Sequence, residues 1–227
     1  MLFEDRQMFF RATKDVDLVL IVESLTADFG RAFWEYIIEA EYEHKNKSTG
    51  STQFYRFASP KTNDYPQMIE LFSKKPEFIP NEDKGMVITP LPIGKDISSL
   101  SAILLNGAYY DLLKDGQVIL DGIPVLNEES LIPFKVKAWL DLTERRAQGE
   151  AVDSRDIKKH KNDVFRLAQL LTDRSKKTLG EEVALDMSRF LKEMEKETID
   201  TKVIGIQGLD QKRILLLLQK CYGLEAN

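Results

Sequence analysis

Hydrophobic positions follow two different spacings along the chain, and each spacing predicts a different kind of secondary structure. In the first half, short apolar runs bounded by turn residues predict strands at 15–23, 53–58, 67–73, 86–88, 117–120 and 123–126. Helical spacing predicts two helices among them, at 26–43 and 98–114. The polar stretches between these elements, at 44–51 and 74–98, are expected to be irregular apart from the strand already given. This order predicts an α+β fold with a mixed β-sheet and flanking helices.

Some strands carry more detailed predictions. Beyond Asp17 the strand 15–23 is apolar on both faces, which is typical of a central strand covered on both sides. The turn-forming stretch 60–64 joins the second and third strands into a predicted hairpin. The pair Asp121-Gly122 is a favoured two-residue turn and predicts a hairpin from the last two strands.

After about residue 127 the pattern becomes helical throughout. It predicts four helices, at 130–146, 153–171, 180–196 and 209–222. Ser130 is the expected N-cap of the first, and Pro133 is expected in its first turn, where a missing N–H costs little. We therefore expect an α/β domain over 1–126 and a C-terminal helical domain over 127–227.

Composition narrows the class of protein. Hydrophobic residues make up 43% and charged residues 30%, so a packed core is expected. The net charge of −5 provides no overall basic field for nucleic acid, although a local basic cleft remains compatible with it. The single cysteine, Cys221, excludes an intrachain disulfide and is expected to be a buried apolar residue. No apolar run approaches the roughly 18 residues that would span a bilayer, and the N-terminus lacks signal-peptide features. These features predict a cytoplasmic protein with no membrane partner.

Two acidic residues at the start of the first strand are the first candidates for chemistry. Asp15 and Asp17 lie two apart, so their carboxylates leave the same face of a strand, roughly 6–7 Å apart. Such a pair can bind a pair of divalent cations, and hard oxygen ligands favour Mg²⁺. The alternative is a solvated junction between a loop and a strand.

The residues around this pair resemble a known motif. The stretch Arg-x-Thr-Lys-Asp-Val-Asp-Leu at 11–18 is similar to that of the nucleotidyltransferase superfamily that includes DNA polymerase beta. It is most similar to the AbiEii-like branch, which comprises toxins of abortive-infection and toxin–antitoxin systems. The resemblance implies that Asp15 and Asp17 hold the catalytic metals, that Thr13 belongs to the nucleotide site, and that a neighbouring strand supplies a third carboxylate. Glu70, an acid flanked by apolar residues, is the candidate, and an outward-facing strand charge is the alternative.

A second match lies at 131–140, where the family carries a lysine three residues before an alanine. Lys135 and Ala138 fit this spacing, and the resemblance implies that Lys135 binds a phosphate. Phe134 and Trp139 in the same stretch are expected to belong to the core rather than to stack on a base.

A third match lies at 156–167, where the family carries a basic residue and an aspartate at the head of a helix. Helical spacing makes His160 and Lys161 border the apolar stripe. The resemblance implies that both belong to the nucleotide site, with Lys161 on the phosphates, and that Asp163 orients Lys161 or assists as a base. The alternative is a helix start with ordinary ion pairs between successive turns.

The chain departs from the family before its first strand. The family has a Gly-Gly or Gly-Ser pair there, whose backbone N–H groups bind phosphates. Fourteen residues precede Asp15, and none is glycine. We expect either a chain shortened relative to the family or a degenerate member that keeps the fold without turnover. A missing strand would expose a sheet edge and favour a homodimer.

The leading hypothesis is therefore a nucleotidyltransferase that uses Mg²⁺ to transfer a nucleotidyl group from an NTP to RNA, a protein or a small molecule. The resemblance adds a possible toxin–antitoxin role with an antitoxin-like partner. The alternative is a non-catalytic interaction or dimerisation module. The chain has no Gly-rich phosphate loop, nucleophilic serine motif or zinc-type Cys/His spacing, which disfavours other kinase, hydrolase and zinc chemistries.

Overall fold

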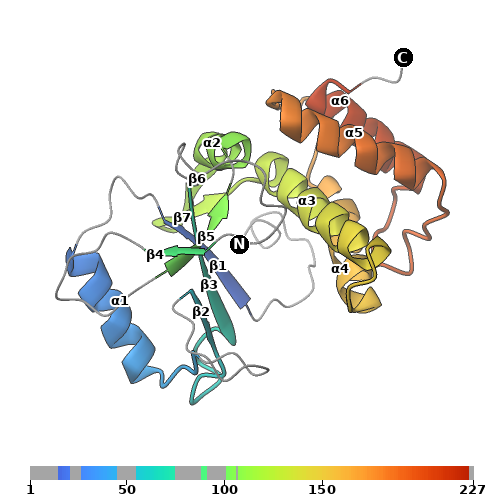
Figure 1. Ribbon diagram of the computed structural model, residues 1–227. Coiled ribbons are helices and arrows are strands. Elements are labelled where there is room, and N and C mark those ends of the chain that lie inside the picture. The colour runs from blue at the N-terminus through green and yellow to red at the C-terminus, as the bar shows by residue number, and fades with distance from the viewer. Residues whose placement is uncertain are drawn as a thin grey trace. The chain divides into compact units, whose positions relative to one another are not determined.

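The computed structural model has an α+β architecture whose chain divides into two compact units (Figure 1). It describes residues 15–20, 27–44, 55–74, 88–90, 101–105 and 107–224. Among the described residues, one unit ends at Tyr110 and the other begins at Asp111. The division thus falls inside a helix, whereas the sequence pattern changes character after residue 126. Thr13 and most of the stretches 44–51 and 74–98 lie outside the described residues.

A five-stranded mixed sheet forms the framework of the first unit. Its strands are β1 (Asp15–Leu20), β2 (Arg56–Ala58), β3 (Met68–Lys74), β4 (Ile88–Pro90) and β5 (Ser101–Leu105). Their order is β1-β3-β5-β4, and β2 also pairs with β3. The neighbours β1, β3 and β5 run parallel, while β2 and β4 are antiparallel to their partners. The predicted hairpin of β2 and β3 is confirmed.

Strand β1 corrects one prediction. Among the described strands its partner is β3, so it lies at the end of the sheet rather than at its centre. Apolar residues on both faces of a strand indicate that the faces are covered. They carry no information about how many strands bond to its edges, because those bonds use the backbone.

Strand β5 corrects a second prediction. The predicted helix at 98–114 is a strand over Ser101–Leu105 followed by helix α2 over Gly107–Asp115. The apolar run Ala-Ile-Leu-Leu pairs with β3 on one side and β4 on the other. Four consecutive apolar residues fit a buried strand as well as a helix, and the non-local pairing decides between them.

Helix α1 (Ala27–Glu39) packs on one face of the sheet (Figure 1). The shared core contains Phe33, Ile37, Ala40, Tyr42, Phe57, Ile69 and Leu71. The helix ends four residues before its predicted end because Glu41 adopts a left-handed conformation with φ 54°. The N–H groups of Glu41 and Tyr42 then bond to the carbonyls of Ile38 and Ile37, which closes a Schellman motif.

The second predicted hairpin is confirmed as β6 (Gln117–Leu120) and β7 (Ile123–Leu126). Asp121 and Gly122 have φ of 51° and 79°, as a type I′ turn requires. The hairpin begins directly after Gly116, the residue that follows α2.

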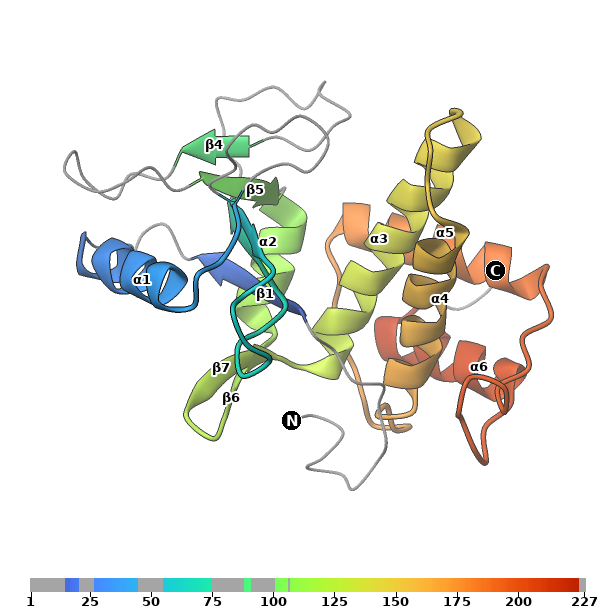
Figure 2. The ribbon, with the colours of Figure 1, turned by 90° about the horizontal axis from the view of Figure 1, so that it is seen from below.

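Four helices complete the second unit (Figure 2): α3 (Glu128–Ala147), α4 (Ser154–Ala168), α5 (Glu181–Glu195) and α6 (Gln211–Tyr222). All four were predicted. The N-cap of α3 is Asn127 rather than Ser130, because the Asn127 side chain accepts a hydrogen bond of 2.9 Å from the Ser130 N–H. The earlier start places Pro133 beyond the first turn. Helix α4 ends before its predicted end, while the apolar pattern continues through buried Leu170 and Leu171.

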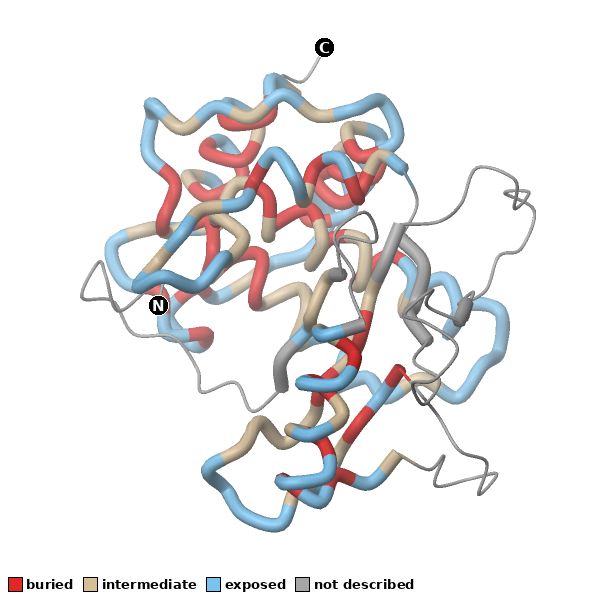
Figure 3. Tube along the Cα trace, turned by 90° about the vertical axis from the view of Figure 1, so that its left-hand side faces the viewer, coloured by how far each residue is buried: buried red, intermediate tan, exposed pale blue. Residues whose placement is uncertain are grey.

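The helices share a core formed by their inward sides (Figure 3). Trp139 is 5% exposed and meets the ring of Phe190 edge to face at 5.3 Å, which confirms its prediction as a core residue. Cys221 is also buried, as expected, and burial raises the pKa of its thiol to about 12. Within the described part of the chain, no helix is long and apolar enough to cross a membrane.

Candidate functional site

Three charged residues lie in one row across the sheet of the first unit. The parallel register of β1 and β3 sets Asp17 opposite Glu70, and the antiparallel register of β2 and β3 sets Arg56 opposite the same Glu70. Residues directly opposite one another on paired strands present their side chains on the same face. Glu70 therefore has an acidic neighbour on one side and a basic neighbour on the other.

This row belongs to the face of the sheet opposite to helix α1. The next residues on β2 and β3, Phe57 and Ile69, belong to the core that α1 covers. Because side chains alternate along a strand, Arg56 and Glu70 point to the other face. The alternation that builds the core thus also gathers the charged residues.

Arg56 and Glu70 form an ion pair on this face. Both Nε and a terminal nitrogen of Arg56 lie 2.5 Å from Oε1 of Glu70. The Glu70 side chain is 14% exposed and that of Arg56 43% exposed. The carboxylate is thus largely removed from water, and the guanidinium group compensates its charge.

The candidate metal ligands are only partly described. Asp17 is exposed and adjoins Glu70, while Asp15 occupies β1 in register with Met68. Carboxylate oxygens suit Mg²⁺ in kind. Among the described side chains, however, no group of three or more His, Cys, Asp or Glu is placed to hold a metal ion. The described geometry therefore provides two neighbouring carboxylates, one of which is engaged by Arg56.

The other predicted site residues belong to the helical unit. Lys135 on α3 acts electrostatically on His160 on α4, which places the two close together. The pKa of His160 is lowered to about 4, mainly by burial. The charges of Lys135 and Lys159 also lower this pKa, and their effect outweighs the opposite effect of Asp163 and Asp156. His160 is therefore neutral at pH 7, and its Nδ1 atom is buried with no hydrogen-bond partner among the described residues.

Asp163 is fully buried, with 0% exposure. Its carboxylate accepts a hydrogen bond of 3.0 Å from Arg166, one turn further along α4. Arg166 also donates to the carbonyl of Ile204, so the pair ties α4 to the segment before α6. This arrangement has the character of an internal structural ion pair, and the catalytic role of Asp163 stays a prediction.

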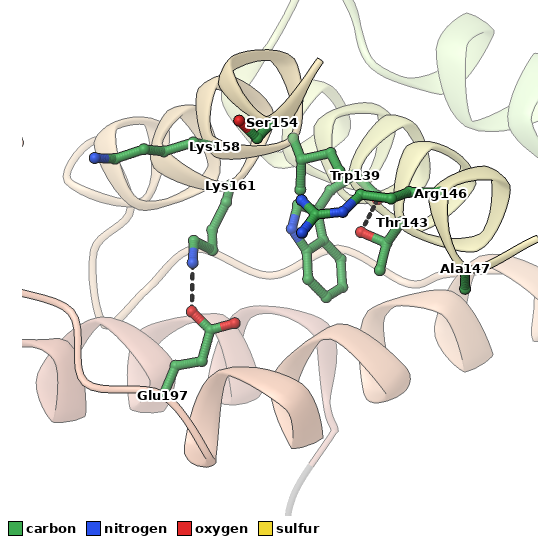
Figure 4. A pocket seen from close by; sticks show the side chains of 9 residues that line it. Trp139, Thr143, Arg146, Ala147, Ser154, Lys158, Lys161 and Glu197 are labelled. Atoms are coloured by element: carbon green, nitrogen blue, oxygen red, sulfur yellow. Dashed lines mark hydrogen bonds and ion pairs between the residues drawn. The ribbon is translucent and has the colours of Figure 1, made fainter. Parts of the chain in front are cut away.

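Lys161 is directed to a different side of α4 from Asp163. Its ammonium group pairs with Glu197, in the segment that follows α5. Lys161 and Glu197 border a groove of about 540 Å³ between α3 and α4 (Figure 4). The structure thus brings together Asp17 with Glu70 and Lys135 with His160, but gives Lys161 and Asp163 separate partners.

The sequence did not identify several charged residues as neighbours of Glu70 or Lys161. Arg56 was detectable in principle, since the predicted hairpin register determines which residue faces Glu70. Lys158 belongs to a short basic segment that is visible in the sequence, but no signal there links it to Arg146, which lines the same groove beside Lys161. They come from different helices, and only the packing of α3 on α4 makes them neighbours.

Comparison with known proteins gives no match: no family model, no curated protein and no solved structure is significantly similar to this chain.

Proposed function

We propose that this protein is a nucleotidyltransferase that binds Mg²⁺ on the sheet face carrying Asp17 and Glu70. The supporting observation is the register of β1 and β3, which makes these two carboxylates direct neighbours on parallel strands. The motif at 11–18 motivates the assignment, and Glu70 on the neighbouring strand is the candidate for the third carboxylate. Asp15 would complete the ligand set.

In this proposal the chain holds a nucleoside triphosphate and an acceptor hydroxyl. When bound, Mg²⁺ would stabilise the charge that develops on the α-phosphate and on the leaving pyrophosphate. Asp15, Asp17 and Glu70 would orient the metal. Lys135 and Lys161, on the helical unit, are the phosphate ligands that the resemblance implies. The acceptor would be an RNA, a protein or a small molecule. A cytoplasmic toxin with an antitoxin-like partner is the biological setting that the motif suggests.

The test is transfer from labelled nucleoside triphosphates in the presence of Mg²⁺ and cellular RNA or protein. The variant Asp17→Asn should lower the rate by about a hundredfold or more, because even the loss of a group that only hydrogen-bonds to a metal ligand costs about 10–100-fold in metal enzymes. Asp28→Asn is the matched control, since it removes the same charge from an exposed carboxylate on α1. If the wild type shows neither transfer nor Mg²⁺-dependent nucleotide binding, the nucleotidyltransferase proposal is excluded.

The ion pair of Arg56 and Glu70 favours a second candidate, a non-catalytic interaction module. A guanidinium group at 2.5 Å from Oε1 competes with a metal ion for the same carboxylate. A module of this kind would bind a partner or a second copy of the chain without turnover. It predicts a stable dimer or complex in sedimentation experiments that is unchanged by Mg²⁺, by NTP or by Asp17→Asn.

A further inference from the structure

The groove between α3 and α4 collects more positive than negative charge. It is lined by Arg146 from α3, by Lys158 and Lys161 from α4, and by the single carboxylate of Glu197. Two positive charges are thus in excess on the surface of a chain whose net charge is −5. The local field therefore has the opposite sign to that of the whole protein and attracts anions.

The positively charged side chains of the groove differ in whether a carboxylate neutralises their charge. Lys161 pairs with Glu197. Arg146 and Lys158 make no ion pair with any described residue, although their neighbours Arg145 and Arg155 pair with Glu150 and Asp153. Figure 4 shows Lys161 directed at Glu197 and Arg146 reaching from α3 toward α4, whereas the ammonium group of Lys158 extends away from both. Two cations are therefore available to a ligand and a third is already opposed by a carboxylate.

The walls of the groove keep this arrangement in place. Trp139 is held in the helical core by Phe190, and the hydroxyl of Thr143 donates to the carbonyl of Trp139. Ile157 lines the α4 side. A packed apolar floor excludes water from one side of the cations and strengthens their attraction for an anion. The volume of about 540 Å³ accommodates a phosphate group together with part of the molecule that bears it.

We propose that this groove is a binding site for phosphate groups, with Arg146 and Lys158 as the primary donors and Glu197 as a competitor that the phosphate displaces from Lys161. Arg offers a planar fork that matches phosphate oxygens, and Lys offers a point charge. The phosphates belong either to a free polyphosphate or to the backbone of an RNA. The site lies wholly within the helical unit and requires no metal ion.

Titration with pyrophosphate, followed by calorimetry at low and raised potassium chloride, tests the site. Arg146→Gln and Lys158→Gln should each weaken binding about tenfold or more, because each removes a charge-assisted hydrogen bond to the phosphate. Glu197→Gln should act in the opposite direction and tighten binding, because it frees Lys161.

Matched controls lie next to each variant on the same helices. Arg145→Gln and Lys159→Gln remove the same charge from positions outside the groove lining. They should leave the affinity within about twofold, as expected for exposed charges that are screened by salt. If these controls weaken binding as much as Arg146→Gln and Lys158→Gln do, or if Glu197→Gln weakens it, the phosphate site does not exist.

A short single-stranded RNA distinguishes the two sources of phosphate. An RNA that displaces pyrophosphate and loses affinity in the same variants identifies backbone phosphates as the ligand. Displacement by nucleoside triphosphate alone identifies a free polyphosphate. Lys161 also belongs to the proposed nucleotidyl transfer, and Asp17→Asn separates the two proposals. This variant should lower the rate of transfer by about a hundredfold or more and leave binding in the groove unchanged.

Discussion

The hydroxyl group of Tyr222 donates a hydrogen bond of 2.9 Å to the carbonyl oxygen of Glu129. In a regular α-helix this carbonyl accepts from the N–H of residue 133, and residue 133 is proline. The last residue of α6 thus supplies the donor that the first turns of α3 lack. Burial raises the pKa of Tyr222, so its hydroxyl keeps the proton that it donates.

Tyr222→Phe should lower the free energy of unfolding by about 1–2 kcal/mol, because the partly buried carbonyl of Glu129 loses its partner. In a Pro133→Ala background the same change should cost much less, because the new N–H of residue 133 can bond to the Glu129 carbonyl. Urea unfolding of the four proteins gives the coupling energy. Equal losses in both backgrounds would show that Tyr222 contributes by packing alone.

Arg56→Gln should free Glu70 from its ion pair. The largely buried carboxylate is then left without its partner, so the free energy of unfolding should fall by about 1–3 kcal/mol. If Glu70 is a metal ligand, Mg²⁺ should raise the melting temperature of Arg56→Gln more than that of the wild type, because a ligand stabilises the state that binds it.

The double variant Arg56→Gln with Glu70→Gln provides the control for this experiment. It should recover part of the lost stability, since neither charge remains, and should show no response to Mg²⁺. An identical Mg²⁺ response of all variants, measured by thermal unfolding at constant ionic strength, would remove Glu70 from the metal site.

Gly116 is required by close packing rather than by a left-handed backbone. A Cβ atom at this position would lie 2.1 Å from Oγ and 2.3 Å from Cβ of Ser130. Gly116→Ala should therefore destabilise the helical unit by about 1–3 kcal/mol, as overpacking does in well-packed cores. Gly107→Ala is the control, because a Cβ there meets nothing within 4 Å, and chemical denaturation should show little change.

His160 should make the protein sensitive to mild acid. Its pKa is lowered to about 4 by burial and by the charges of Lys135 and Lys159. The unfolded chain, with an ordinary pKa near 6.5, therefore binds the proton first as the pH falls. The stability conferred by neutral His160 is complete above about pH 6.5 and declines toward pH 4.

With allowance for screening by water, this loss should amount to about 1–2 kcal/mol. His160→Gln should abolish that part of the decline, while the titration of the carboxylates remains in both proteins. The measurement is the free energy of unfolding at several pH values between 7 and 4. Parallel curves for wild type and variant would contradict the lowered pKa.

Local signals were sufficient wherever an element is determined by neighbouring residues. The hairpin at Asp121-Gly122 and the helices α5 and α6 follow their predicted ranges within two residues, because turn geometry and helical spacing act over a few positions. The same holds for the pairing of β2 with β3, from which the position of Arg56 opposite Glu70 follows.

Tertiary structure decided the features that join distant segments. Strand β5 replaced the first half of a predicted helix because β3 and β4 offer it hydrogen bonds that the run 101–105 does not encode. Lys161, 36 residues from Glu197, acquired its partner through the packing of the helical core. The sequence by itself determined which residues carry charge and with what period they recur. Only the folded chain decided which charges meet, because hydrogen bonds and ion pairs depend on distances across elements that periodicity does not contain.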